Sequence, residues 1–133
     1  GRFQCLKKQP LFFVDGAHNP EGAKSLRESI QTYFPDKHIL LMMGVFKDKD
    51  YGEILEIMSD VSEELIVFTP DHPRGLSSSL LCERAKACFK NVIDGKTAEG
   101  ALNLAKTKAD ADTVIVSFGS LSTIAGMCAL AAD

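Results

Sequence analysis

The feature that most constrains the fold of this chain is the alternation of short apolar runs with stretches of helical periodicity. The run Leu11–Val14 is apolar at every position, as expected of a strand buried on both faces of a sheet. Further runs of strand length are expected at 3–6, 39–43, 65–69, 92–93 and 114–118. The alternation predicts one α/β domain over residues 1–133, a Rossmann-like three-layer fold with a mostly parallel sheet and helices on both faces.

The stretches between these runs carry their own helix start signals. Asn19 fits an N-cap and Pro20 the first helical position, and Asp50 and Thr97 are expected to cap later helices in the same way. Gly119-Ser120 is expected to open the last helix, which runs to about Ala132. Another helix is expected to carry the apolar side chains Leu81, Ala85, Cys88 and Phe89.

Composition limits the classes of partner. The 133 residues include 15 basic and 18 acidic side chains without a basic cluster, which excludes the electrostatic footprint of a nucleic-acid binder. The longest apolar stretch, 39–45, is too short for a bilayer, and no basic-then-apolar leader opens the chain. Cys5, Cys82, Cys88 and Cys128 form no C-x-x-C pair and lie far from the histidines in sequence, so we expect reduced, buried thiols in a cytoplasmic protein and no metal site.

Parallel α/β sheets bind ligands beyond the carboxyl ends of their strands. The strongest candidate there is the loop DGAHNP at 15–20, which joins a buried strand to a capped helix. The carboxylate of Asp15 can accept hydrogen bonds from ribose hydroxyls, and His18 can donate to a phosphate oxygen beside the free N–H groups of the helix start. The alternative is a plain turn in which Asn19 caps the helix and Asp15 and His18 are solvated.

The other loops at this edge carry weaker signals. Lys49 can pair with a substrate carboxylate or phosphate, and Arg74 can bind an anion. The Ser120 hydroxyl and the N–H groups of the helix start can hold a carboxylate. Each has a structural alternative, namely a solvated charge run, an arginine in water and an ordinary serine N-cap. The sequence contains no Ser-His-Asp order, no paired catalytic carboxylates and no P-loop.

Together these residues resemble the C-terminal domain of the folylpolyglutamate synthase/dihydrofolate synthase family, in the Mur ligase superfamily. The matching motifs, in the expected order over nearly the whole chain, are Gly1-Arg2, DGAHNP at 15–20, Asp48-Lys49-Asp50, Pro73-Arg74 and Gly119-Ser120-Leu121. DGAHNP is the most specific of them. The chain departs from the family pattern at Lys47 and Gly75, which leaves open whether Lys47 or Lys49 faces substrate.

The resemblance implies an ATP-dependent amide ligase that adds glutamate to a folate or dihydropteroate through an acyl phosphate. It implies that ATP and Mg²⁺ are held mainly by an N-terminal ATPase domain of the same enzyme, which this chain lacks, so the isolated domain is predicted to be inactive. It also implies residue roles: Arg2 on ATP phosphates, Asp15 on the ribose, His18 on the γ-phosphate or the glutamate, Asn19 orienting the loop, and Lys49 and Ser120 near the glutamate.

Other functions stay open at this point. One is a Mur-type amino-acid ligase with a different acyl substrate, and another is a non-catalytic nucleotide-binding module. A phospho-receiver domain shares the alternating pattern but needs an acidic pair, whereas Lys7-Lys8-Gln9-Pro10 precedes the run Leu11–Val14. Dihydrofolate synthesis, polyglutamate synthesis and both together are also open, because that choice depends on a folate pocket shared with another domain.

Overall fold

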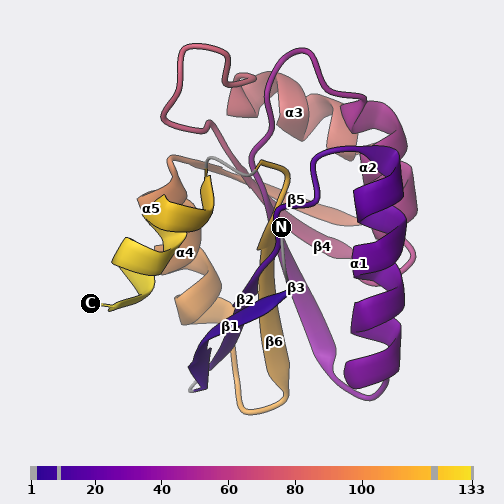
Figure 1. The fold of residues 1–133 in the computed structure, drawn as a ribbon, viewed down its shortest axis with the longest axis vertical. Coiled ribbons are helices and arrows are strands. Elements are labelled where there is room, and N and C mark those ends of the chain that lie inside the picture. Colours follow the sequence, from indigo (N-terminus) through magenta and orange to yellow (C-terminus); the bar gives the residue numbers. More distant parts are fainter. Residues whose placement is uncertain (1–2, 9, 121–122, 133) are drawn as a thin grey trace.

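A sheet forms the middle layer of the computed structural model, which describes residues 3–8, 10–120 and 123–132. Within these residues the sheet has six strands in the order β1-β2-β6-β3-β4-β5 (Figure 1). The strands are β1 (Gln4–Lys8), β2 (Leu11–Val14), β3 (His38–Met43), β4 (Glu64–Phe68), β5 (Asn91–Lys96) and β6 (Thr113–Phe118). Only β1 runs antiparallel to its neighbour, β2, so the predicted mostly parallel sheet is confirmed.

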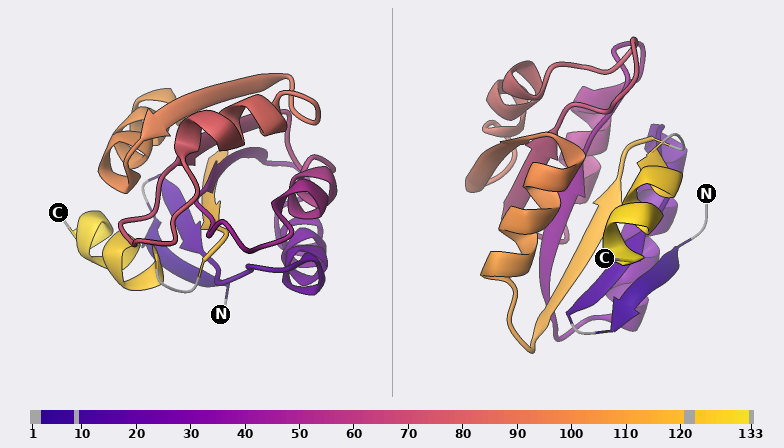
Figure 2. Two further views of the ribbon diagram at one scale, coloured as in Figure 1. Left: turned by 90° about the horizontal axis from the view of Figure 1, so that it is seen from above. Right: turned by 90° about the vertical axis from the view of Figure 1, so that its left-hand side faces the viewer.

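Helices cover both faces of the sheet, as predicted (Figure 2). One face packs against α1 (Pro20–Tyr33), α2 (Tyr51–Met58) and α3 (Ser78–Ala85), and the other against α4 (Ala98–Lys108) and α5 (Thr123–Ala132). Side chains of a strand point alternately to the two faces, so Leu41 joins the first core and Leu40 the second. No helix in the described ranges is long and apolar enough to cross a membrane.

Two of the three predicted helix caps are confirmed in full. The Asn19 side chain accepts a hydrogen bond from Gly22 N–H at 2.8 Å, and the Thr97 hydroxyl accepts one from Gly100 N–H at 2.9 Å. Asp50 occupies the N-cap position of α2, but its side chain makes no capping hydrogen bond. Its ψ of 63° departs from the extended backbone of the other two caps, which directs a cap side chain back over the helix start.

Several predicted boundaries were wrong. The strand β5 is longer than the run 92–93, because its polar residues are tolerated on an edge strand paired only with β4. The helix α3 ends at Ala85, so Cys88 and Phe89 lie in the turn beyond it, where both of their N–H groups donate to Ala85 O. The helix α5 is described from Thr123, and residues 121 and 122, which separate it from Gly119-Ser120, lie outside the described residues.

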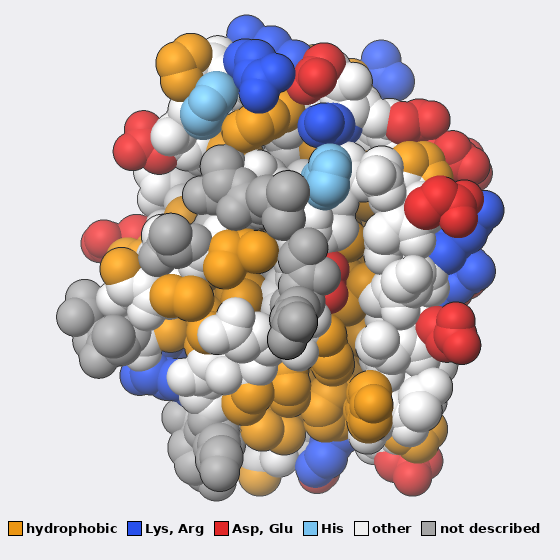
Figure 3. All heavy atoms as spheres, viewed as in Figure 1, with side chains coloured by type: hydrophobic (Ala, Val, Ile, Leu, Met, Phe, Trp, Pro, Cys, Tyr) orange, Lys and Arg blue, Asp and Glu red, His pale blue; other side chains and the backbone are white. Residues whose placement is uncertain are grey.

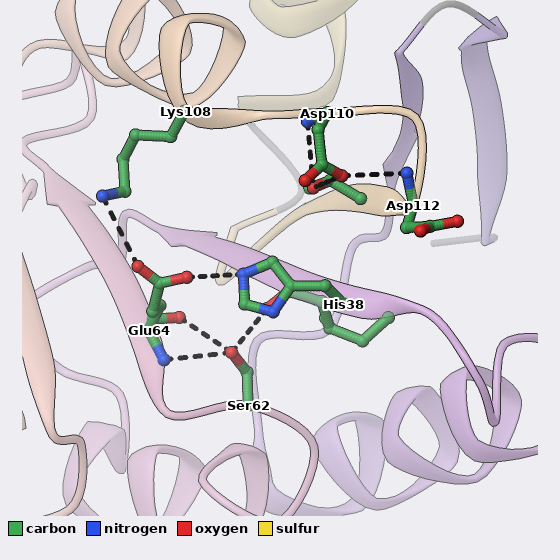
Figure 4. Close-up of polar contacts among 8 residues, drawn as sticks. His38, Ser62, Glu64, Lys108, Asp110 and Asp112 are labelled. Carbon is green, nitrogen blue, oxygen red and sulfur yellow. Dashed lines mark hydrogen bonds and ion pairs between the residues drawn. The ribbon is translucent and has the colours of Figure 1, made fainter.

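Two side chains have surroundings that differ from those expected. Cys5 is exposed because it lies on the edge strand β1, so the prediction of a buried thiol was wrong for this residue. His38 was expected to be a plain strand-edge residue, but its Nε2 lies 2.5 Å from Oε1 of Glu64 at the amino ends of β3 and β4 (Figure 4). The other Glu64 oxygen lies 3.5 Å from Lys108 Nζ on α4. This ionic cluster ties α4 to the sheet at the edge opposite the candidate loops.

Candidate functional site

The loops after β2, β3 and β6 are joined at the carboxyl edge of the sheet. Asp15 N–H donates to Ser117 O at 2.9 Å, and Gly119 N–H donates to Ala17 O at 2.8 Å. On the other side of β6, Gly44 N–H donates to Phe118 O at 3.3 Å. These bonds are possible because β6 lies between β2 and β3, so its end can contact both neighbouring loops.

Two glycines allow this close approach. Gly119 has a φ of +117°, and a Cβ there would lie 2.1 Å from Gly44 O. A Cβ on Gly44 would lie 2.4 Å from the ring of Phe68. The motif Gly119-Ser120 therefore has a structural reason for its glycine, since no other residue fits both the backbone angle and the space.

The DGAHNP loop is held by its own side chains. Oδ1 of Asp15 accepts a hydrogen bond from Ala17 N–H at 2.8 Å, and Nδ1 of His18 lies 2.8 Å from Gly16 O. The cap made by Asn19 fixes the start of α1. Asp15 and His18 are thus fixed residues of a structured loop, and the alternative of two merely solvated side chains does not describe them.

Asp15 is half-buried, and burial raises the pKa of its carboxyl above the usual value, while the hydrogen bond from Ala17 N–H opposes that rise. A desolvated carboxylate gains more than a solvated one from a hydroxyl or a cation that approaches it. Asp15 is therefore suited to hold a polar ligand at this edge.

A cavity of about 400 Å³ opens beside this loop. Its wall includes Asp15, His18 and Asn19, and the helix α1 adds Ser25 and Ser29 one turn apart. In the same view as Figure 1, histidine, lysine and arginine side chains gather over the carboxyl-edge loops, while the lower part of this face is hydrophobic (Figure 3). The cavity is thus a recess with polar and apolar walls at the more basic end of the face.

A second structure at this edge is a flap, which we define as 45–47 paired with 74–76. Phe46 and Gly75 form an antiparallel bridge, and Lys47 N–H donates to Arg74 O at 2.9 Å. The Arg74 guanidinium lies over the Phe46 ring, 4.9 Å from its centroid, and the His72 ring stacks on Phe46 at 4.5 Å. Arg74 therefore braces the flap through its side chain.

The predicted site residues fall into two groups in the structure. Asp15, His18 and Asn19 line the cavity, whereas Arg74 lies on the flap, where its guanidinium is 4.0 Å from Asp48 Oδ2. Lys49 follows the flap and is partly buried, whereas Lys47 is exposed.

Ser120 directly follows Gly119 and is buried, with 3% of its surface exposed. Arg2 lies outside the described residues.

Sequence reasoning missed several residues of this edge. Ser25 and Ser29 carry a weak signal, because residues four apart share one helix face. Phe46 gives none, because its stacking with His72 depends on two loops that are distant in sequence. Among the described residues, no group of three His, Cys, Asp or Glu side chains could hold a metal ion.

Comparison with known families connects this geometry to a group of ligases. The family model for the Mur ligase glutamate ligase domain matches residues 1–121. The chain belongs to this family. The match includes the DGAHNP loop and the flap, so the two groups of residues at the carboxyl edge are both within the family's domain.

Relatives and solved structures agree with this membership. The chain is 29% identical to the dihydrofolate synthase/folylpolyglutamate synthase of Haemophilus influenzae, over 94% of its own length and 33% of the relative. It resembles the Mycobacterium tuberculosis folylpolyglutamate synthase complexed with ADP, with a TM-score of 0.93 and 27% identity, covering 100% of this chain and 32% of that one. A bifunctional Yersinia pestis enzyme with Mn, AMPPNP and L-glutamate bound gives a TM-score of 0.86 and 29% identity, with 97% and 30% coverage. The chain thus spans about a third of the length of these three proteins.

Proposed function

We propose that this chain is the single glutamate ligase domain, residues 1–133, of an ATP-dependent ligase that joins glutamate to a folate or dihydropteroate. The observation that carries the proposal is the cavity built on DGAHNP, where Asp15 and His18 meet the start of α1. The family membership supports it, as do related structures that contain ADP or an ATP analogue with L-glutamate. The partner reactants are accordingly ATP, glutamate and a folate.

In this proposal the residues of the cavity bind and orient ATP. The Asp15 carboxylate accepts hydrogen bonds from the ribose hydroxyls, using the oxygen that Ala17 N–H does not occupy. Asn19 contributes through the helix start, because its Oδ1 is engaged by Gly22 N–H. The N–H groups at the start of α1 favour an anion, as helix N-termini do. His18 lies in the loop between Asp15, the proposed ribose-binding residue, and the start of α1, the proposed anion-binding position.

The flap and the loop after β6 are proposed to hold glutamate. Lys49 and Arg74 supply positive charge for the carboxylates of glutamate. Arg74 also braces the flap, because its guanidinium packs on the Phe46 ring. Ser120 supplies a hydroxyl beside the joined loops. Ser120→Ala is expected to raise the KM for glutamate and to leave that for ATP nearly unchanged.

The phosphoryl-transfer machinery is proposed to come from an N-terminal ATPase domain of the same enzyme. The described residues hold no cluster of metal ligands, so we assign Mg²⁺ to that domain. ATP supplies the phosphoryl group that activates the folate carboxylate. The four cysteines are free thiols, which favours a reducing compartment, and we place the enzyme in the cytoplasm.

The test is an assay of the full-length enzyme that contains this chain. ATP, Mg²⁺, labelled glutamate and either dihydropteroate or a reduced folate are supplied, and the amide product is measured by mass spectrometry. We expect glutamate to be incorporated with release of ADP. Asp15→Ala should mainly raise the KM for ATP, because the lost hydrogen bonds are made in the ground state and the transition state alike. Binding of ATP without incorporation from either acyl substrate would instead indicate a non-catalytic nucleotide-binding module.

A further inference from the structure

The hydrogen bond made by His18 determines which ring nitrogen carries its proton. Nδ1 lies 2.8 Å from the carbonyl oxygen of Gly16. A carbonyl oxygen only accepts, so Nδ1 must be the donor in this pair. In the neutral imidazole the other nitrogen, Nε2, then has no hydrogen and presents a lone pair. A neutral His18 can therefore accept a proton at Nε2, and only the charged ring could donate from that atom to a phosphate.

The backbone around His18 holds this arrangement in place. Both polar groups of the Ala17 backbone are engaged, its N–H by Asp15 Oδ1 and its C=O by Gly119 N–H. Ala17 itself is buried, with 4% of its surface exposed. Because Ala17 separates Gly16 from His18, the acceptor carbonyl and the imidazole are fixed relative to each other. The hydrogen bonds that connect the loops thus also fix the tautomer of His18.

His72, which lies next to the flap, has the opposite arrangement. Its Nδ1 lies 3.1 Å from the backbone nitrogen of Arg74, which donates to it. The neutral ring of His72 therefore carries its proton on Nε2 and can donate from that atom. The carboxyl edge thus holds one histidine that accepts in the cavity and another that donates at the flap, and only His18 lines the cavity.

We propose that His18 is a catalytic residue that accepts a proton at Nε2 from the amine of the incoming amino acid. The inference rests on the proposed function, because it needs an acyl phosphate to be present. Asp15 and His18 line the same cavity, so the proposed proton acceptor lies in the same recess as the carboxylate proposed to bind the ribose.

The amine nitrogen forms a bond to the acyl carbon, and the bond from that carbon to the phosphate oxygen breaks. The phosphate leaves with the electron pair of that bond, and one N–H proton of the amine passes to Nε2. The imidazolium keeps its Nδ1–H on Gly16 O and later releases the new proton to the phosphate or to water.

The first test measures the tautomer directly. In this chain, ¹H–¹⁵N correlation spectra of labelled histidine are expected to show His18 with a protonated Nδ1 and an unprotonated Nε2 when the ring is neutral. His72 serves as the internal comparison, with the opposite pattern. A protonated Nε2 on neutral His18 would overturn the inference without any reference to activity.

The second test separates proton transfer from activation in the full-length enzyme. His18→Gln keeps a polar group near the Nε2 position but cannot take up a proton. Its kcat for ligation of glutamate is expected to fall by about a hundredfold, the lower range for general base catalysis, with the KM for ATP unchanged. Hydroxylamine is a strong nucleophile that is neutral at neutral pH, so trapping of the acyl phosphate as a hydroxamate should remain close to the unsubstituted rate. His38→Gln makes the same change at the opposite edge of the sheet and should alter neither rate.

The outcomes are distinguishable. Loss of ligation with normal hydroxamate formation supports the inference. Equal loss of both reactions in His18→Gln overturns it, because His18 would then act before the amine attacks, and so does normal ligation in that variant. Absence of hydroxamate in the unsubstituted enzyme overturns the proposed function and the inference with it.

Discussion

Gly119 is a residue at which both the backbone angle and the available space oppose an added side chain. Its φ of +117° is unfavourable for any side chain, and a Cβ there would meet Gly44 O at 2.1 Å. Gly119→Ala is therefore expected to lower the free energy of unfolding by about 3 kcal/mol. Chemical denaturation of the purified variant measures this.

The matched control for Gly119 is Gly52, which lies in α2, where an added Cβ would meet nothing within 4 Å. Gly52→Ala should stabilise the chain by roughly 0.5–1 kcal/mol, because alanine loses less conformational freedom in a helix. Equal effects of the two substitutions would contradict the close approach of the loops.

Asp15 combines its proposed binding role with a cost in stability. Burial raises the pKa of its carboxyl, so the folded protein binds a proton there more tightly than the unfolded chain does. The contribution to stability is therefore fully present below the unfolded pKa, about 4, and is lost as the pH rises through the higher folded-state pKa. The Asp15→Asn variant has no carboxyl at this position, so it does not lose stability there as the pH rises. Its amide oxygen can still accept the hydrogen bond from Ala17 N–H.

Asp15→Asn is accordingly expected to gain in Tm relative to the unsubstituted chain as the pH is raised from about 4 to 7. Thermal melts of both proteins across this range check it. Melting curves that keep a constant separation in Tm would show that the carboxyl is not desolvated in the fold.

At the scale of elements, α1 and α2 begin in different ways. Asn19 caps α1 through a hydrogen bond to Gly22 N–H, whereas Asp50 stands at the same position of α2 without one. Asn19→Ala should cost about 1 kcal/mol of stability, and Asp50→Ala should cost clearly less. Urea denaturation of the two variants gives the comparison. A larger loss for Asp50→Ala would mean that its charge at the helix start outweighs a capping hydrogen bond.

At the scale of the whole molecule, the chain forms a fold but supplies only one wall of the proposed reaction site. Phosphoryl transfer depends on positioning and on charge stabilisation by a phosphate-binding loop and Mg²⁺. The chain has no P-loop, and its described residues contain no cluster of metal ligands. The 133-residue chain alone is therefore expected to release no ADP above background when mixed with ATP, Mg²⁺, a folate and glutamate. A coupled ADP assay measures this release. Sustained release of ADP would contradict the assignment of phosphoryl transfer to an N-terminal ATPase domain.

The sequence by itself determined the features that depend on near neighbours in the chain. Apolar runs such as Leu11–Val14 predicted the buried parallel strands. Asn19 and Thr97 predicted helix starts, because the side chain of a cap residue bonds to a backbone N–H only three residues further along the chain. The position of DGAHNP after a buried strand placed the candidate site at the carboxyl edge. The edge strand β5 was underestimated because its polar residues hide the strand pattern.

Only the tertiary structure decided the features that depend on which strands are neighbours. The position of β6 between β2 and β3 brings Gly119 against Ala17 and Gly44, and apolar periodicity carries no information on that order. The stacking of Arg74 on Phe46 and the hydrogen bond between His38 and Glu64 likewise join segments separated by more than twenty residues. The hydrogen bonds from Asp15 N–H to Ser117 O and from Gly119 N–H to Ala17 O fix the DGAHNP loop against the end of β6, so the arrangement of the loop depends on a strand that the motif itself does not contain.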